Sequence, residues 1–129
     1  MKKLIGILTA TLLLTLTGCK TIPMPDYSNQ PLASYGGTKS TLQDVEKSIV
    51  QAAVSLGWQT KRIEDGKISA TLNIRKHQLI VLITYDTESV SVNYVDSENL
   101  KYNGESIHRQ YANWITNLLR KINTNHLTR

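Results

Sequence analysis

The chain has 129 residues, with 15 basic and 10 acidic side chains, a formal net charge of +5, and hydrophobic side chains at 40% of its positions. This length fits one small domain with a core of its own and is too short for two. The single cysteine excludes an internal disulfide, so packing must stabilise the fold. The basic residues are scattered and not interleaved with aromatic residues, which argues against a nucleic-acid partner.

The first predicted element is an export signal over residues 1–18. Two lysines precede an apolar run over residues 4–16, which is too short to span a bilayer durably and is typical of a secretory signal. The run closes with Leu16-Thr17-Gly18-Cys19, which resembles the lipobox of bacterial lipoproteins. This resemblance implies cleavage before Cys19 and acylation of its sulfur. The alternatives are a chance thiol behind an ordinary signal, or a core cysteine of a protein that stays inside the cell.

The resemblance also implies a location in the cell. Lys20, and not an aspartate, follows Cys19. In enteric lipoproteins that resemble this one, such a residue implies transfer to the outer membrane with the domain facing the periplasm; the inner membrane and the cell surface are the alternatives. Two or three acyl chains on one residue make the anchoring permanent. Cleavage leaves 111 residues, in which thirteen basic and ten acidic side chains give a net charge of +3.

Residues 19–37 are predicted to form a lipidated flexible tether. They contain all three prolines of the chain, a Gly36-Gly37 pair and no apolar period. The alternative is that Tyr27 and Tyr35 hold this segment against the domain or a partner. A single α+β periplasmic domain is then expected over residues 38–126.

The domain is predicted to begin with a helix. Ser40 or Thr41 is expected to cap its first turn, with Gln43 or Asp44 completing a capping box. Gly57 is expected to end the helix. Its apolar residues recur at helical spacing and share one face: Leu42, Val45, Ile49, Ala52, Ala53 and Leu56.

Strands are predicted next. Residues 58–63 form a short strand, and the Asp65-Gly66 pair suits a tight hairpin turn before an alternating strand over residues 67–74. The nearly continuous apolar run over residues 79–85 predicts a central strand covered on both faces or nearly so, with Leu82 in the core. A turn at residues 86–89 leads into another alternating strand.

A second helix is predicted from Ser106 onward, with an apolar stripe formed by Ile107, Tyr111, Trp114, Ile115, Leu118 and Ile122. Two amphipathic helices on either side of a strand region, in the order α-β-β-β-β-α, bury their stripes against the same sheet face. The sequence therefore predicts an α+β two-layer sandwich with an antiparallel meander of three or four strands.

The residue pattern indicates no reaction. No two histidines have the spacing that lets one helix face hold a metal, so neither a metal nor a cofactor is expected. His77 falls in a connection between strands and His126 in a frayed tail. His108 is predicted at the edge of the second helix's stripe as a half-buried residue covering the core; a functional His108 would need an orienting carboxylate, for which Glu105 is the local candidate.

The long polar segment over residues 96–106 is the candidate interaction site, because loops of this length in compact domains are often functional. The candidate binding residues in it and at the start of the helix are Ser97, Asn99, Tyr102, His108 and Arg109. The alternative is that Ser97 and Asn99 satisfy backbone groups and that Tyr102 covers the sheet edge.

Several short segments are similar to a pattern found in small uncharacterised bacterial lipoproteins: Gly57-Trp58, Gly66-Lys67-Ile68, Arg75-Lys76-His77, Asp96 to Tyr102, Ile107-His108 and Tyr111 to Ile115. The likeness covers residues 41–122 and implies an α+β periplasmic domain with no assigned activity.

Three functions remain open from the sequence. The first is a lipid-anchored, non-catalytic module that holds an envelope protein or glycan partner. The second is a small-molecule or lipid binder with a cavity lined by Trp58, Tyr85, Tyr94 and Trp114. The third is a hydrolase that uses His108 with Ser97 or Tyr102. The sequence sets no oligomeric state.

Overall fold

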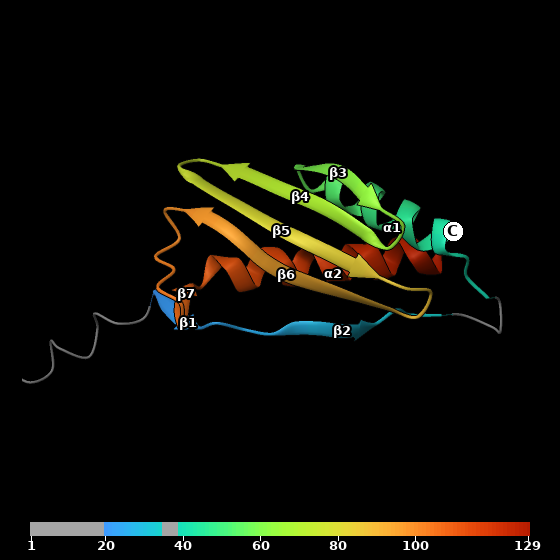
Figure 1. Cartoon of the computed structure of the whole chain (residues 1–129), viewed down its shortest axis with the longest axis horizontal. Helices are drawn as coiled ribbons and strands as arrows, with labels where there is room; N and C mark the ends of the chain where they lie inside the picture. The colour runs from blue at the N-terminus through green and yellow to red at the C-terminus, as the bar shows by residue number, and fades with distance from the viewer. Residues whose placement is uncertain (1–19, 35–38) are drawn as a thin grey trace, which may run out of the picture.

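The computed structural model describes residues 20–34 and 39–129, so the predicted signal peptide and Cys19 lie outside the described residues. Within these ranges a five-stranded antiparallel sheet has the order β2-β6-β5-β4-β3, and β1 pairs with β7 in a second, two-stranded sheet. Both helices lie on one face of the large sheet (Figure 1). The elements are β1 (Thr21–Pro23), β2 (Tyr27–Pro31), α1 (Leu42–Ser55), β3 (Trp58–Glu64), β4 (Lys67–Ile74), β5 (His77–Tyr85), β6 (Ser89–Glu98), β7 (Ser106–His108) and α2 (Gln110–Leu127).

The predicted α+β class and helix-covered antiparallel sheet are confirmed, and the predicted three or four strands are too few. The meander from β3 to β6 is the predicted one. The additional strands come from residues expected to be tether and from residues expected to be helix.

The start of α1 follows from local sequence. The side chain of Thr41 accepts a hydrogen bond from the Asp44 backbone N–H at 3.0 Å, and the Asp44 carboxylate accepts one from the Thr41 N–H at 2.9 Å. These reciprocal bonds satisfy two backbone donors that the first turn leaves open, which confirms the predicted capping box. Gly57 follows the helix with φ of 92°, a backbone conformation that glycine adopts without steric cost.

The tether prediction is wrong for residues 20–34. In β1, Ile22 pairs with Ile107, and in β2, Tyr27 pairs with Val92 at the edge of the large sheet. Ile22, Met24, Tyr27 and Leu32 are partly buried against the core. Prolines are compatible with edge strands, where a missing N–H costs no ladder bond. Tyr27 therefore does hold this segment against the domain, whereas Tyr35 lies outside the described residues.

Within residues 20–34 and 39–129, the central strand β5 is covered on one face only. Leu79, Val81, Ile83 and Tyr85 are buried, whereas Ile80 and Leu82 are half-buried on the opposite face. Leu82 has polar neighbours, Ser69 on β4 and Asn93 on β6. The prediction that Leu82 is a core residue is wrong, because both helices cover the same face of the sheet and leave the other without a second layer.

The second helix begins later than predicted. Residues 106–108 form β7, and α2 starts at Gln110. Ile107 is fully buried, as its place in the apolar stripe suggested, but it reaches the core from a strand. Strand β7 forms by pairing with β1, which lies more than eighty residues earlier in the chain. The residues around β7 therefore carry no local signal for a strand.

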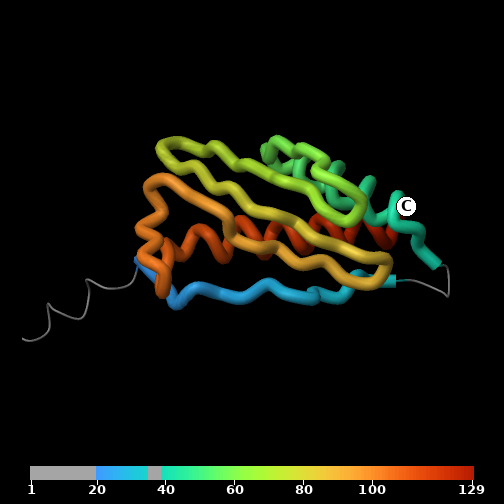
Figure 2. Tube along the Cα trace, in the orientation of Figure 1, coloured from blue at the N-terminus to red at the C-terminus, as the bar shows by residue number. Residues whose placement is uncertain are grey.

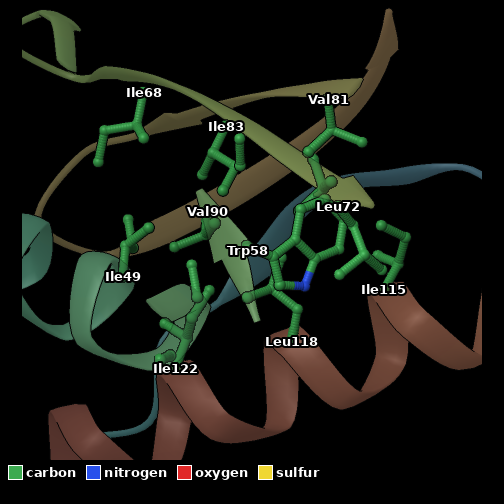
Figure 3. Packing of buried hydrophobic residues seen from close by; sticks show 14 of the residues in the cluster. Ile49, Trp58, Ile68, Leu72, Val81, Ile83, Val90, Ile115, Leu118 and Ile122 are labelled. Carbon is green, nitrogen blue, oxygen red and sulfur yellow. The ribbon is translucent and has the colours of Figure 1, made fainter. Parts of the chain in front are cut away.

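The core lies between the helices and the sheet. In Figure 3, Ile49 of α1 and Ile115, Leu118 and Ile122 of α2 face the side chains of the strands. Val81, Ile83 and Leu118 are fully buried. The predicted core position of Leu118 is confirmed.

Candidate functional site

The predicted interaction loop is held rigidly at one end of the sheet. The Asn99 side chain donates to the Lys76 carbonyl at 2.7 Å, and the Asn99 carbonyl lies 2.8 Å from Nδ1 of His77. Leu100 is buried, and its carbonyl accepts a hydrogen bond from the His108 N–H at 2.8 Å. The loop is therefore fixed to the β4–β5 connection and to β7.

The backbone is unusual at three positions, one in the β4–β5 connection and two in the loop. Arg75, Asn99 and Lys101 all have positive φ values, between 55° and 59°, in the left-handed region that non-glycine residues rarely adopt. Such conformations persist only where the surrounding contacts enforce them. The hydrogen bonds of Asn99 are contacts of this kind.

Of the candidate binding residues, Tyr102 belongs to a cluster of tyrosines and Ser97 lies beside that cluster. The rings of Tyr94 and Tyr102 lie 4.3 Å apart, and the hydroxyl of Tyr94 lies 2.6 Å from Ser97 Oγ. Tyr94 also meets Tyr111 edge to face at 6.1 Å, and burial raises the pKa of the Tyr111 hydroxyl. Tyr102 remains 40% exposed, so one face of this cluster is open to a partner.

His108 lies in β7 and is half-buried, as expected, although on a strand and not on a helix. Its ring is 6.0 Å from that of His77, and His77 in turn lies 5.8 Å from the Trp114 ring. Nδ1 of His108 accepts a hydrogen bond from the Gln110 N–H at 3.1 Å. Burial, followed by the nearby charges of His77, Lys101, Lys20 and Arg109, lowers the pKa of His108.

The hydrolase hypothesis needed His108 to activate Ser97 or Tyr102. The hydrogen bonds of Ser97 join it to Tyr94 and to the Asp96 side chain, and those of His108 join it to its own backbone neighbourhood. The described contacts therefore do not assemble that pair.

Five exposed cations gather at this end of the molecule, which we call the basic pole: Lys20, Arg75, Lys76, Lys101 and Arg109. Lys20 is placed there because its carbonyl accepts a hydrogen bond from the Arg109 N–H at 2.9 Å. None of the five forms an ion pair within the described residues; the four ion pairs found there involve Arg62, Lys67 and Arg129. Of these five, only Arg109 is among the candidate binding residues predicted from the sequence.

A surface groove lies between α1 and the edge strand β3. It has a volume of about 640 Å³ and is lined by Leu42 and Val50, by the charged residues Glu46, Lys47, Arg62 and Asp65, and by Thr41, Gln43 and Gln51. Arg62 Nε contacts Glu46 at 3.3 Å and its guanidinium also contacts Asp65. The hydrogen bond to Glu46 raises the pKa of Arg62.

His126 was expected in a frayed tail and is instead buried near the end of α2. Its Nε2 lies 2.8 Å from Ser40 Oγ, and its Nδ1 lies 3.4 Å from Ser48 Oγ. Ser48 donates its own hydrogen to the Asp44 carbonyl, so Ser48 Oγ is left to accept from Nδ1–H, and in a neutral ring Nε2 then accepts from Ser40. The His126 ring thus joins the start of α1 to the end of α2, and its burial lowers the pKa of His126.

The proposed cavity of aromatic residues does not form as one site. Trp58 and Tyr85 are buried in the core, at 4% and 7% exposure. Tyr94 joins the tyrosine cluster, and Trp114 lies against His77. These four side chains line none of the three grooves described on the surface.

Among residues 20–34 and 39–129, no three His, Cys, Asp or Glu side chains come together as metal ligands. No helix in the same ranges is long and apolar enough to cross a bilayer. Comparison of the chain with protein-family models, curated proteins and solved structures found no match.

Proposed function

We propose that the protein is a lipid-anchored, non-catalytic interaction module of the cell envelope that binds an extended segment of an envelope protein along β3. The observation that carries this proposal is the open edge of the large sheet beside the groove. Within the described residues β3 pairs with β4 only, so alternate residues of β3 direct backbone N–H and C=O groups outward. An edge strand next to a helix-walled groove is the geometry used for binding by strand addition.

The chemistry of the groove suits a peptide better than a small apolar ligand. Leu42 and Val50 lie two turns apart on α1 and offer apolar surface for alternate side chains of an added strand. Between them, the paired Arg62 and Glu46 offer both a donor and an acceptor. Main-chain hydrogen bonds to β3 would supply affinity, and these side chains would supply specificity.

The opposite edge of the sheet is less suited to strand addition. Strand β2 carries Pro31, which has no N–H, and the pairing register shifts between Tyr27 and Gln30. Bulges and prolines are devices that discourage edge pairing. The two edges of the sheet therefore differ, and β3 is the one available to a partner.

The anchor part of the proposal rests on the lipobox resemblance at Cys19. We expect the wild-type protein to take up a palmitate analogue and to sediment with the outer membrane, and Cys19→Ser to lose both properties. An unlabelled wild-type protein, or a Cys19→Ser protein that stays in the membrane fraction, would contradict the anchor.

The strand-addition part is tested by photo-crosslinking in the native host. Photoreactive residues at Lys61 and Ile63, two positions apart on β3, should capture positions two residues apart in one segment of one partner. A probe at Thr116, which is exposed on α2, is the matched control and should not capture that segment. Capture of unrelated positions, or equal capture from Thr116, would refute strand addition.

A further inference from the structure

We infer that the basic pole rests on the anionic phospholipid headgroups of the membrane that holds the anchor, and thereby fixes the orientation of the domain. This inference rests on the lipid anchor of the proposed function. Its occupant is the phosphate-bearing surface of an anionic bilayer, and it concerns a different face from the β3 groove.

The first step is the position of the anchor. Lys20 follows Cys19 directly and belongs to the basic pole, since the Arg109 N–H binds its carbonyl and Thr21 pairs with His108 in β1 and β7. Figures 1 and 2 show the chain entering the folded part at the end where β4 meets β5 and where the loop after β6 lies. The lipid chains would therefore attach at the basic pole, with no spacer between them and the sheet.

The second step is the range of the electrostatic force. Attraction between a cation and an anionic membrane falls off within a Debye length, about 8 Å at physiological ionic strength. A domain on a long flexible tether would spend most of its time beyond that distance. Because β1 begins at Thr21, the cations of this domain stay within reach of the headgroups.

The third step is the availability of the charges. The five cations of the basic pole are exposed and make no ion pair within the described residues. Three carboxylates, Asp96, Glu98 and Glu105, lie in the neighbouring segments, so the cations outnumber them by five to three. The Asn99 side chain donates to the Lys76 carbonyl, which fixes the backbone from which the Lys76 side chain extends.

The opposite end of the sheet has a different character. The β5–β6 turn there carries Asp86 and Glu88, which form no ion pair within the described residues, whereas Glu64 at the end of β3 and Asp65 in the β3–β4 turn pair with Lys67 and Arg62. Strand β6, with ten residues, separates the two ends by about 30 Å. An anionic surface would therefore attract the basic pole and repel the β5–β6 turn.

The test uses the lipidated protein, purified from membranes and reconstituted in vesicles. Because Cys19 is blocked by acylation, an introduced cysteine is the only thiol available to a fluorophore. One label is placed at Asn103→Cys in the loop of the basic pole, and the other at Thr87→Cys in the β5–β6 turn. Headgroup spin-labelled lipid quenches a fluorophore that lies close to the membrane surface.

In vesicles that contain phosphatidylglycerol, we expect the label at position 103 to be quenched at least about twofold more than the label at position 87. The difference should shrink in phosphatidylcholine vesicles and in 0.5 M salt, because screening removes the attraction. Reversal of three cations, Arg75→Glu with Lys76→Glu and Lys101→Glu, should abolish it. The matched reversal Lys47→Glu with Lys61→Glu and Arg120→Glu changes the net charge equally and should preserve it.

Equal quenching of the two labels in anionic vesicles would overturn the inference, as would a difference that survives the pole reversal or high salt. If the pole reversal fails to fold, shown by its melting curve, the salt and lipid dependence of the wild-type protein decides alone. Loss of membrane attachment in the Cys19 experiment refutes the anchor, whereas a lipidated protein without preferential quenching refutes only the orientation.

Discussion

The packing of the two leucines Leu118 and Leu82 gives the sharpest test of the fold. Leu118 is fully buried between α2 and the sheet, so Leu118→Ala should leave a cavity and lower the free energy of unfolding by about 2–5 kcal/mol. Leu82 is half-buried on the open face of the sheet, between Ser69 and Asn93, so Leu82→Ala should cost less than about 1.5 kcal/mol. The two substitutions remove the same atoms, and only the position in the fold differs.

Urea unfolding of residues 20–129, followed by circular dichroism, measures both variants under the same conditions. Domains of this size have a total stability of about 5–15 kcal/mol, so the loss in Leu118→Ala would be a large share of it. Equal losses in the two variants would mean that a second layer covers the outer face of β5. That layer would have to be a partner or another copy of the chain, and the one-sided core would be wrong.

Three further predictions concern single residues. Burial lowers the pKa of His126 below its ordinary value of 6.5, so the unfolded chain binds a proton on this residue more readily than the folded chain does. The melting temperature should therefore be constant above about pH 6.5 and fall as the pH drops below that value. The substitution His126→Gln should weaken this pH dependence of the melting temperature. Gly104→Ala, at φ of 95° with no atom within 4 Å of the new Cβ, should cost about 1–2 kcal/mol for its left-handed backbone alone. Gly66→Ala, at φ of 81°, should cost more, because the new Cβ would also lie 3.1 Å from the Tyr85 carbonyl; urea titration compares the two variants. Asn99→Ala should lower the melting temperature because it removes the side-chain hydrogen bond to the Lys76 carbonyl, while Arg109→Ala should not; the reverse order would mean that the loop is not held by the Asn99 side chain.

The sequence predicted the elements whose cause is local. Thr41 and Asp44 specify the start of α1 by themselves, and Asp65-Gly66 specifies the hairpin between β3 and β4. The alternation of apolar and polar residues correctly predicted that Ile68, Ala70 and Leu72 lie on the inner face of β4. Each of these predictions needed only the neighbouring residues.

The errors arose where the cause is distant. An apolar run such as residues 79–85 is typical of a strand covered on both faces, and nothing in it reveals that both helices lie on the same side. The residues around Pro23 and Pro31 look like a tether until β7 and β6 are available to pair with them. His126 gained its partners Ser40 and Ser48 only when α1 and α2 came together.

The candidate binding residues illustrate the same limit. Ser97, Asn99, Tyr102, His108 and Arg109 do lie at one end of the molecule, and their role as a site stays a prediction. The sequence indicated their polarity but not their neighbours, so the contributions of Lys20, Lys76 and Lys101 could not be predicted. Those three cations come from three separate segments, which only the pairing of β1 with β7 and the Asn99 contacts bring together.

The replacement of a tether by strands changes what the protein would do at a membrane. A flexible tether of 19 residues could extend to about 60 Å and let the domain search for a partner at any height. In the proposed orientation the sheet rises directly from the headgroups, and β4, with eight residues, places the turn of the groove about 26 Å above the basic pole. A partner segment would then have to present its strand at that height and along the direction of β3. The geometry therefore favours a partner held at the same membrane over one that diffuses freely, since a fixed groove gains most from a segment that is itself held in place.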